Sequence, residues 1–143
     1  MKIQRFDHMH VTPANFELFN EKFQKFMGYD YLMNMPMPQY GTNVAYEPFP
    51  IGMEAFQVTD ASVSFSAKVA AENPGVFTIS YKVENLADSI KEMEAMGWKM
   101  LEYIDNAPII EALFDTKADF GFYIELIETP FDNMREMMAA MQQ

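Results

Sequence analysis

The sequence predicts an α+β fold in which two βαβββ modules form a cleft between curved mixed sheets, followed by a C-terminal helix. One order of elements, a strand, a helix and three strands, occurs twice along the 143 residues. The spacing also repeats: His8 lies 20 residues before Gly28, and Thr78 lies 19 residues before Gly97. A repeat of this length, ~70 residues, is too long for a solenoid unit and predicts two halves that face each other.

The first module spans about residues 3–58, beginning with a strand over 3–11. Asn15, after Thr12-Pro13, is placed to begin a helix, and Gly28 is placed to end it. Four aromatic residues at helical spacing form one apolar face that we expect in the core: Phe16, Phe19, Phe23 and Phe26. Three strands are expected near 29–35, 43–49 and 52–58, separated by proline and glycine.

The second module spans 76–128 and follows a polar connector, 59–75, part of which we expect to form a turn of helix. It begins with a strand over 76–83, and Asn85 is a suitable N-cap for the next helix. Strands are expected at 98–104, 108–115 and 120–127. Glu54 and Glu125 each fall on the last strand of a module, 26 residues after Gly28 and 28 after Gly97. A final helix is expected over 131–143, which completes a single domain.

Composition excludes several functions. The net charge of −11 argues against binding to duplex nucleic acid or to an anionic membrane, and it would suit a cationic ligand. The absence of cysteine excludes disulfides, thiolate metal sites and cysteine nucleophiles. No apolar run reaches ~18 residues, and the N-terminus lacks the apolar stretch of a signal peptide. We therefore expect a cytoplasmic protein. The cleft predicted between the two modules suits a small-molecule ligand, because pockets favour such interfaces.

Four segments together resemble the vicinal oxygen chelate superfamily, which includes glyoxalase I, methylmalonyl-CoA epimerase, extradiol dioxygenases and bleomycin-resistance proteins. The segments are Phe6-Asp7-His8-Met9-His10-Val11, Gly75–Val83 with Asn85-Leu86, the helix 86–96 closed by Gly97, and Phe114-Asp115-Thr116 through Gly121 to Tyr123–Glu128. The last segment is the most specific and is similar to the closing strand of glyoxalase-like members. The resemblance covers about residues 5–128.

The resemblance implies a metal site made by the first and last strands of each module. The matching positions are His8, Glu54, Thr78 and Glu125. His8, Glu54 and Glu125 can bind a divalent metal, whereas the neutral hydroxyl of Thr78 stands where the family has a second histidine. His10 is a candidate for the missing ligand. Zinc, nickel, manganese, iron and cobalt all accept histidine and carboxylate, and the sequence does not choose among them.

Strand alternation adds residues to the same face, because side chains two positions apart point the same way. If the implied metal positions face the cleft, then so do His10, Phe56, Ser80 and Tyr123. With Thr78, these are the predicted ligand-binding residues. A core seldom collects so many polar groups, whereas a cleft does.

Two functions remain open at this stage. The first is a glyoxalase- or epimerase-like lyase or isomerase, in which Glu54 or Glu125 takes the proton alpha to a carbonyl and a metal stabilises the resulting enediolate. The second is a non-catalytic protein that sequesters a ligand, as bleomycin-resistance proteins do. The acidic composition and the aromatic residues Phe56 and Tyr123 suit the second function.

The C-terminal helix carries four methionines on one face: Met134, Met137, Met138 and Met141. Burying a methionine side chain is worth ~1.5–3 kcal/mol, so we expect this face to be covered. We predict a homodimer in which this helix lines the interface or covers the mouth of a cleft.

Overall fold

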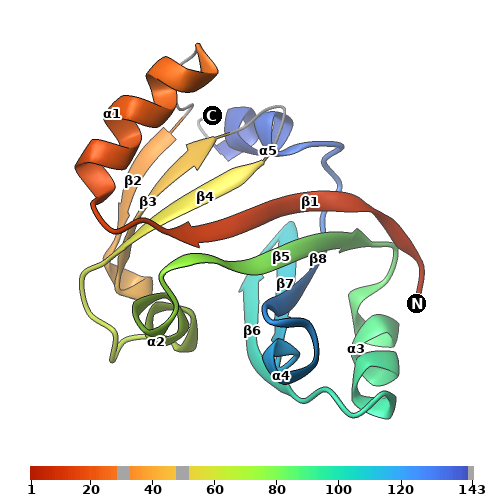
Figure 1. Cartoon of the computed structure of the whole chain (residues 1–143). Coiled ribbons are helices and arrows are strands. Elements are labelled where there is room, and N and C mark those ends of the chain that lie inside the picture. The colour runs from red at the N-terminus through yellow and green to blue at the C-terminus, as the bar shows by residue number, and fades with distance from the viewer. Residues whose placement is uncertain (29–32, 48–51, 142–143) are drawn as a thin grey trace.

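Eight strands form one continuous curled sheet in a computed structural model that describes residues 1–28, 33–47 and 52–141 (Figure 1). The strand order is β2-β3-β4-β1-β5-β8-β7-β6. The strands are β1 (Ile3–Thr12), β2 (Met33–Met37), β3 (Thr42–Glu47), β4 (Met53–Val58), β5 (Gly75–Val83), β6 (Met100–Asn106), β7 (Ile109–Phe114) and β8 (Tyr123–Glu128). The expected strand segments at 29–32 and 48–49 lie outside the described residues.

The two halves of the sheet have the same internal order, which confirms the two predicted βαβββ modules. Counted inward from each edge, the first half reads β2-β3-β4-β1 and the second reads β6-β7-β8-β5. The last strand of each module pairs in parallel with the first, β4 with β1 and β8 with β5. The modules join where β1 runs antiparallel to β5. The sheet therefore places the first and last strands of both modules at its centre.

A helix covers the outer side of each half, α1 (Phe16–Met27) in the first and α3 (Leu86–Ala95) in the second (Figure 1). Both N-caps are the predicted asparagines: Asn15 Oδ1 accepts from the Leu18 amide at 2.8 Å, and Asn85 Oδ1 accepts from the Asp88 amide at 2.8 Å. Each cap satisfies a backbone donor that has no partner within the helix.

The aromatic face of α1 is only partly in the core. Phe16 is buried beside Val11 and Ala55, but Phe26 is 79% exposed. The expectation that all four phenylalanines lie in the core is therefore wrong at Phe26. Figure 1 shows the reason: the C-terminal turns of α1 extend past the sheet, so the same helix face has less to pack against there.

The connector contains a helix, α2 (Phe65–Glu72), which is longer than the single turn that the sequence predicted there. Ser64 caps this helix, and the Glu102 carboxylate of β6 accepts from the amides of Phe65 and Ser66 at 3.2 and 3.0 Å. A carboxylate at a helix N-terminus is favourable because it meets unpaired donors and the positive end of the helix dipole. Two further short helices, Pro38–Tyr40 (η1) and α4 (Lys117–Phe120), were not predicted.

The C-terminal helix α5 (Met134–Met141) begins three residues later than expected. Met137 is buried in the main core cluster; the side chains of Met134, Met138 and Met141 lie outside the described part of the structure. Two cations hold the segment that leads to the helix: Lys82 Nζ and Arg5 Nη2 donate to the Phe131 carbonyl at 2.7 and 3.2 Å. Among the described residues, no helix is long and apolar enough to cross a membrane.

Candidate active site

Four strands at the centre of the sheet bring the predicted site residues together. His10 of β1 is the partner of Glu54 on β4, and Ser80 of β5 is the partner of Glu125 on β8. Across the seam between the modules, His8 pairs with Ser80. Because alternate residues share a face, this register places two imidazoles and two carboxylates on one side of the sheet.

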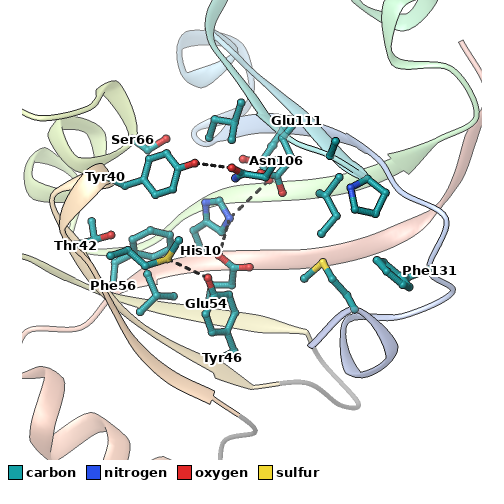
Figure 2. A pocket seen from close by; sticks show the side chains of 18 of the residues that line it. His10, Tyr40, Thr42, Tyr46, Glu54, Phe56, Ser66, Asn106, Glu111 and Phe131 are labelled. Atoms are coloured by element: carbon teal, nitrogen blue, oxygen red, sulfur yellow. Dashed lines mark hydrogen bonds and ion pairs between the residues drawn. The ribbon is translucent and has the colours of Figure 1, made fainter. Parts of the chain in front are cut away.

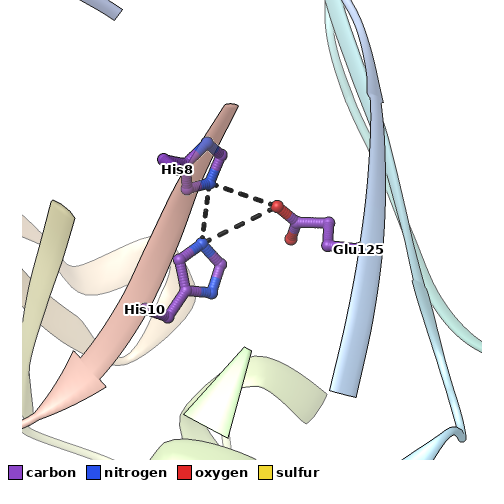
Figure 3. A group of neighbouring side chains, drawn as sticks. All are labelled: His8, His10 and Glu125. Atoms are coloured by element: carbon purple, nitrogen blue, oxygen red, sulfur yellow. Dashed lines mark hydrogen bonds and ion pairs between the residues drawn. The ribbon is translucent and has the colours of Figure 1, made fainter. Parts of the chain in front are cut away.

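The imidazoles of His8 and His10 and the Glu125 carboxylate form a compact triangle (Figure 3). The two Nε2 atoms are 2.9 Å apart. Glu125 Oε1 lies 3.2 Å from His8 Nε2 and 3.7 Å from His10 Nε2. His8 and Glu125 were predicted metal ligands, and His10 takes the place proposed for it as the replacement ligand.

Ligand bonds of ~2.1 Å in a tetrahedral site require donor atoms roughly 3.4 Å apart. The separations within the triangle of His8, His10 and Glu125, 2.9 to 3.7 Å, surround that value, and the three side chains are buried. Two imidazoles and one carboxylate therefore fit a divalent transition metal. Glu54 places a second carboxylate beside this triangle: its Oε1 lies 3.8 Å from His8 Nε2, and its Oε2 lies 3.5 Å from His10 Nε2.

A carboxylate behind the triangle orients the His8 ring. Asp7 Oδ2 lies 2.8 Å from His8 Nδ1 and forms an ion pair with Arg5 through its other oxygen. A register shift between Phe6 and His8 in the β1–β5 pairing makes this contact available, because neighbouring residues on a regular strand point to opposite faces. This arrangement leaves His8 Nε2 directed at the site, as a metal-bound histidine requires.

Gly52 lets β4 start close to this part of β1. Its amide carbonyl accepts from the Met9 amide at 2.8 Å, and its φ of 66° lies in the left-handed region. A Cβ at this position would lie 2.5 Å from the Asp7 carbonyl oxygen. Glycine is therefore required here on both steric and conformational grounds.

The two histidines have opposite proton affinities. Burial works against the charged form of His8, but Glu54, Asp7 and Glu125 outweigh it and raise the His8 pKa well above its usual range. Burial lowers the pKa of His10, the Glu125 charge opposes this and the His8 charge reinforces it, and the resulting pKa is about 4. In the metal-free protein His8 is therefore the cation and His10 the neutral acceptor of the His8–His10 hydrogen bond.

The two glutamates also differ. Burial raises the pKa of Glu54, the His8 charge opposes this and the Glu125 charge reinforces it, and the resulting pKa is about 7. Burial would raise the pKa of Glu125 too, but its interactions with His10 and His8 lower it below the usual value. Glu125 is thus a permanent anion beside the imidazoles, whereas Glu54 exchanges a proton near neutral pH.

Three of these side chains, His10, Glu54 and Glu125, line a cavity of about 470 Å³ together with Phe56 (Figure 2). Most of the remaining wall is apolar and comes from both modules and from the C-terminal segment: Met37, Val44, Ile104, Pro108, Ile109, Phe131, Met137 and Ala140. Tyr40 Oη donates to Asn106 Oδ1 at 2.9 Å, which joins the two modules at the cavity wall.

Three predicted ligand-binding residues, Thr78, Ser80 and Tyr123, are not among the described residues that line the cavity. Thr78 and Ser80 are completely buried within the sheet, and each hydroxyl lacks a hydrogen-bond partner among the described residues. The Tyr123 ring is half-buried and is not among the residues described as lining the cavity. Thr78 and Ser80 nevertheless stay next to the site, because they pair with His10 and His8 across β1 and β5.

Sequence reasoning missed Asp7, Tyr46 and Glu111. Glu111 lies on β7 and lines the cavity; burial and the Glu125 charge raise its pKa well above the usual value. The sequence contained a signal for Glu111, because it is the one charged residue in the otherwise apolar strand Ile109–Phe114. Tyr46 also lines the cavity, and its hydroxyl donates to Met37 Sδ at 3.3 Å. Its pKa is raised by burial.

Comparison with solved structures agrees with this architecture. A methylmalonyl-CoA epimerase variant from Streptomyces coelicolor, in complex with 2-nitronate-propionyl-CoA, matches with a TM-score of 0.75 at 15% identity over 91% of this chain and 100% of that chain. The methylmalonyl-CoA epimerase from Mycobacterium tuberculosis matches with a TM-score of 0.73 at 19% identity over 96% and 93%. A hypothetical protein from Bacillus halodurans matches with a TM-score of 0.72 at 15% identity over 90% and 96%.

Such epimerases belong to the vicinal oxygen chelate superfamily. The chain has the vicinal oxygen chelate fold. No protein-family model and no curated protein sequence matches the chain. At these identities the structural likeness shows the fold alone, so the chemistry must be argued from the residues of the cavity.

Proposed function

We propose that this protein is a metal-dependent isomerase of the epimerase type, which moves a proton on the carbon next to a carbonyl group. One observation carries the proposal. Two imidazoles that touch each other lie within 4 Å of two carboxylates, one from each module, at a largely apolar cavity. The structural neighbours, named as methylmalonyl-CoA epimerases, support the same reaction class.

His8, His10 and Glu125 are the residues that would hold the metal. They are buried, and Asp7 fixes the ring of His8 from behind. A divalent ion at this position would supply the positive charge that stabilises an enediolate. The lowered pKa of Glu125 suits a ligand, because a carboxylate must be deprotonated to bind a metal.

Glu54 is the proposed base. It lines the cavity beside the metal ligands, and a pKa of about 7 lets it both take and return a proton at neutral pH. The C–H bond next to the carbonyl breaks, its electron pair forms a C=C bond, the C=O π pair moves to the oxygen, and the proton goes to Glu54. Protonation of the opposite face of the carbon by a second acid gives the other stereoisomer; Glu111, which also lines the cavity and whose pKa is raised, is the proposed donor.

The test uses (R)-acetoin, a small uncharged compound with two adjacent oxygens, and the zinc-loaded protein in D₂O. We expect loss of the C3 proton signal by NMR together with loss of optical activity. Glu54→Gln should keep zinc and lower the exchange rate at least about a hundredfold, the low end for a general base. Glu94→Gln, the same change on an exposed turn of α3, is the matched control.

Exchange that survives in Glu54→Gln would assign the base elsewhere. A wild-type protein that does not retain zinc after dialysis would remove the metal-dependent reaction altogether.

One observation favours a second candidate, sequestration of a cationic aromatic ligand. Phe56, Tyr46 and Phe131 line the same cavity as Glu54 and Glu111, so rings and carboxylates could surround an ammonium group. Tight binding of benzylamine to the metal-free protein, without acetoin exchange by the zinc-loaded form, would support this function over the enzymatic one.

A further inference from the structure

The walls of the cavity contain no positive side chain among the described residues. The chain has ten lysines and arginines, and none lines the cavity. The segments outside the description, 29–32, 48–51 and 142–143, contain no lysine or arginine in the sequence. A bound metal would therefore supply the positive charge that no lysine or arginine supplies at the cavity wall.

The two cations that approach the cavity from behind are already engaged. Arg5 forms an ion pair with Asp7 and donates to the Phe131 carbonyl. Lys82 donates to the same carbonyl at 2.7 Å. Neither side chain is free to turn toward a ligand without releasing the segment that forms part of the cavity wall.

The negative side chains are by contrast concentrated there. Glu54, Glu111 and Glu125 all line the cavity. Away from them the wall is mostly hydrocarbon and aromatic, formed by residues such as Met37, Val44 and Ile109, and its other polar side chains, such as Tyr40, Thr42, Ser66 and Asn106, are uncharged. A carboxylate or phosphate placed in this cavity would lose much of its hydration and meet no cation, which disfavours its binding.

We propose that the substrate is an uncharged carbonyl compound whose part away from the metal is apolar, and that CoA esters and dicarboxylates are excluded. The inference rests on the proposed function for the reaction and adds the substrate class. It sets this chain apart from the neighbours that were solved with 2-nitronate-propionyl-CoA or methylmalonyl-CoA, because a CoA ester carries phosphates that proteins recognise with lysine and arginine. The net charge of −11 would also repel such a polyanion.

The test compares two chelating probes of equal chain length on the zinc-loaded protein by calorimetry. Hexanohydroxamic acid ends in a methyl group, and adipic acid monohydroxamate ends in a carboxylate. We expect the first to bind at least about tenfold more tightly, since only the second buries an unpaired charge. Methylmalonyl-CoA should neither bind detectably nor exchange its α-proton.

Two substitutions of Ile104 test whether the lack of a positive side chain causes this preference. Ile104 lies on the edge strand β6, lines the cavity and is half-buried, so a lysine there can bury its stem and present its ammonium group to the cavity. Ile104→Lys should raise the affinity for the carboxylate probe until the two probes bind alike. Ile104→Met, of similar length and uncharged, should keep the wild-type preference.

Equal or tighter binding of the carboxylate probe by wild type, or turnover of methylmalonyl-CoA, would overturn the inference. If zinc does not bind, the proposed function fails separately, and the substrate class is then tested on the metal-free protein with hexanamide against hexanoate by ligand-observed NMR. Preferential binding of the amide supports the inference, and equal binding of the two overturns it.

Discussion

The two modules share one scaffold but supply different chemistry. Their strands have the same order and pair in the same directions, and Glu54 and Glu125 occupy equivalent places on their last strands. The relation that exchanges the modules also exchanges His8 with Thr78 and His10 with Ser80, as the cross-strand pairs His8–Ser80 and His10–Thr78 require. Both imidazoles thus come from the first module, and the second has hydroxyls in their places.

The difference extends to the residue behind the site. Asp7 of the first module contacts the His8 ring, whereas the corresponding position of the second module is Phe77, a buried core residue. The second module has neither the imidazole nor the carboxylate that would orient it. The repeat therefore specifies where donors can stand, while the residues at those places decide which donors each module offers to a metal.

The largest effect is expected from removing an imidazole of the first module. His8→Ala should lower zinc affinity by more than about a hundredfold, because a ligand loss exceeds the 10–100-fold typical of a supporting residue. Competition with a chromophoric chelator measures it. Met9→Leu, on the same strand but facing away, should leave the affinity unchanged. Retained affinity in His8→Ala would show that the metal site does not depend on this imidazole.

The supporting carboxylate should give the next largest effect. Asp7→Asn keeps the size of the side chain but weakens its interaction with His8 Nδ1, so zinc affinity should fall about 10–100-fold. Phe77→Leu, at the corresponding position of the second module, should change zinc affinity far less than that. A comparable loss of affinity in both variants would indicate that general packing, and not ring orientation, explains the result.

A ligand added to the second module should have a smaller effect of opposite sign. Thr78→His restores an imidazole at the position where the superfamily resemblance places one, and we expect roughly tenfold tighter zinc binding. Thr78→Val, which has the same shape without a donor, is the control. Weaker binding in Thr78→His than in wild type would mean that the two modules cannot both supply imidazoles in this packing.

The smallest expected effect is the dependence of zinc affinity on pH. His8 holds a proton at neutral pH, since its pKa is raised, and Glu54 is partly protonated with a pKa of about 7. Zinc must displace the proton of His8, so its affinity should rise with pH until His8 is deprotonated in the metal-free protein. Calorimetry in buffers of different ionisation enthalpy should show release of about one proton or more at pH 7. Zinc binding without proton release would contradict the assignment of His8 as a cation.

Periodicity and capping made the fold predictable. Residues such as Asn15 and Asn85 act on their own helices within a few positions, so local sequence is sufficient to place them. Phe26 shows the limit, because its burial depends on how far the sheet extends beneath α1. The full length of α2 depended on Glu102, a residue more than thirty positions away that accepts from its first amides.

The part of the site that lies on one face of the sheet was predictable, because side chains alternate between the two faces of a strand. His8, His10, Glu54 and Glu125 share a face and were found by parity and resemblance together. Asp7 could not be found in this way, because alternation directs it away from His8 and only the irregular register at that point brings the two side chains together. The contributions of Phe131 and Met137 depend on the path of a loop, which no local pattern specifies.

The attachment of the C-terminal segment has a consequence for the evolution of specificity. Arg5 and Lys82 bind the main-chain carbonyl of residue 131, which every amino acid possesses, and not its side chain. Substitution of the phenylalanine can therefore reshape the cavity while its anchor stays in place. Neither Arg5 nor Lys82 belongs to the triangle of His8, His10 and Glu125. This wall of the cavity can therefore diverge without disturbing the three side chains of the triangle. In a lineage descended from such a protein, new substrates would be expected to arise first through changes in this tail.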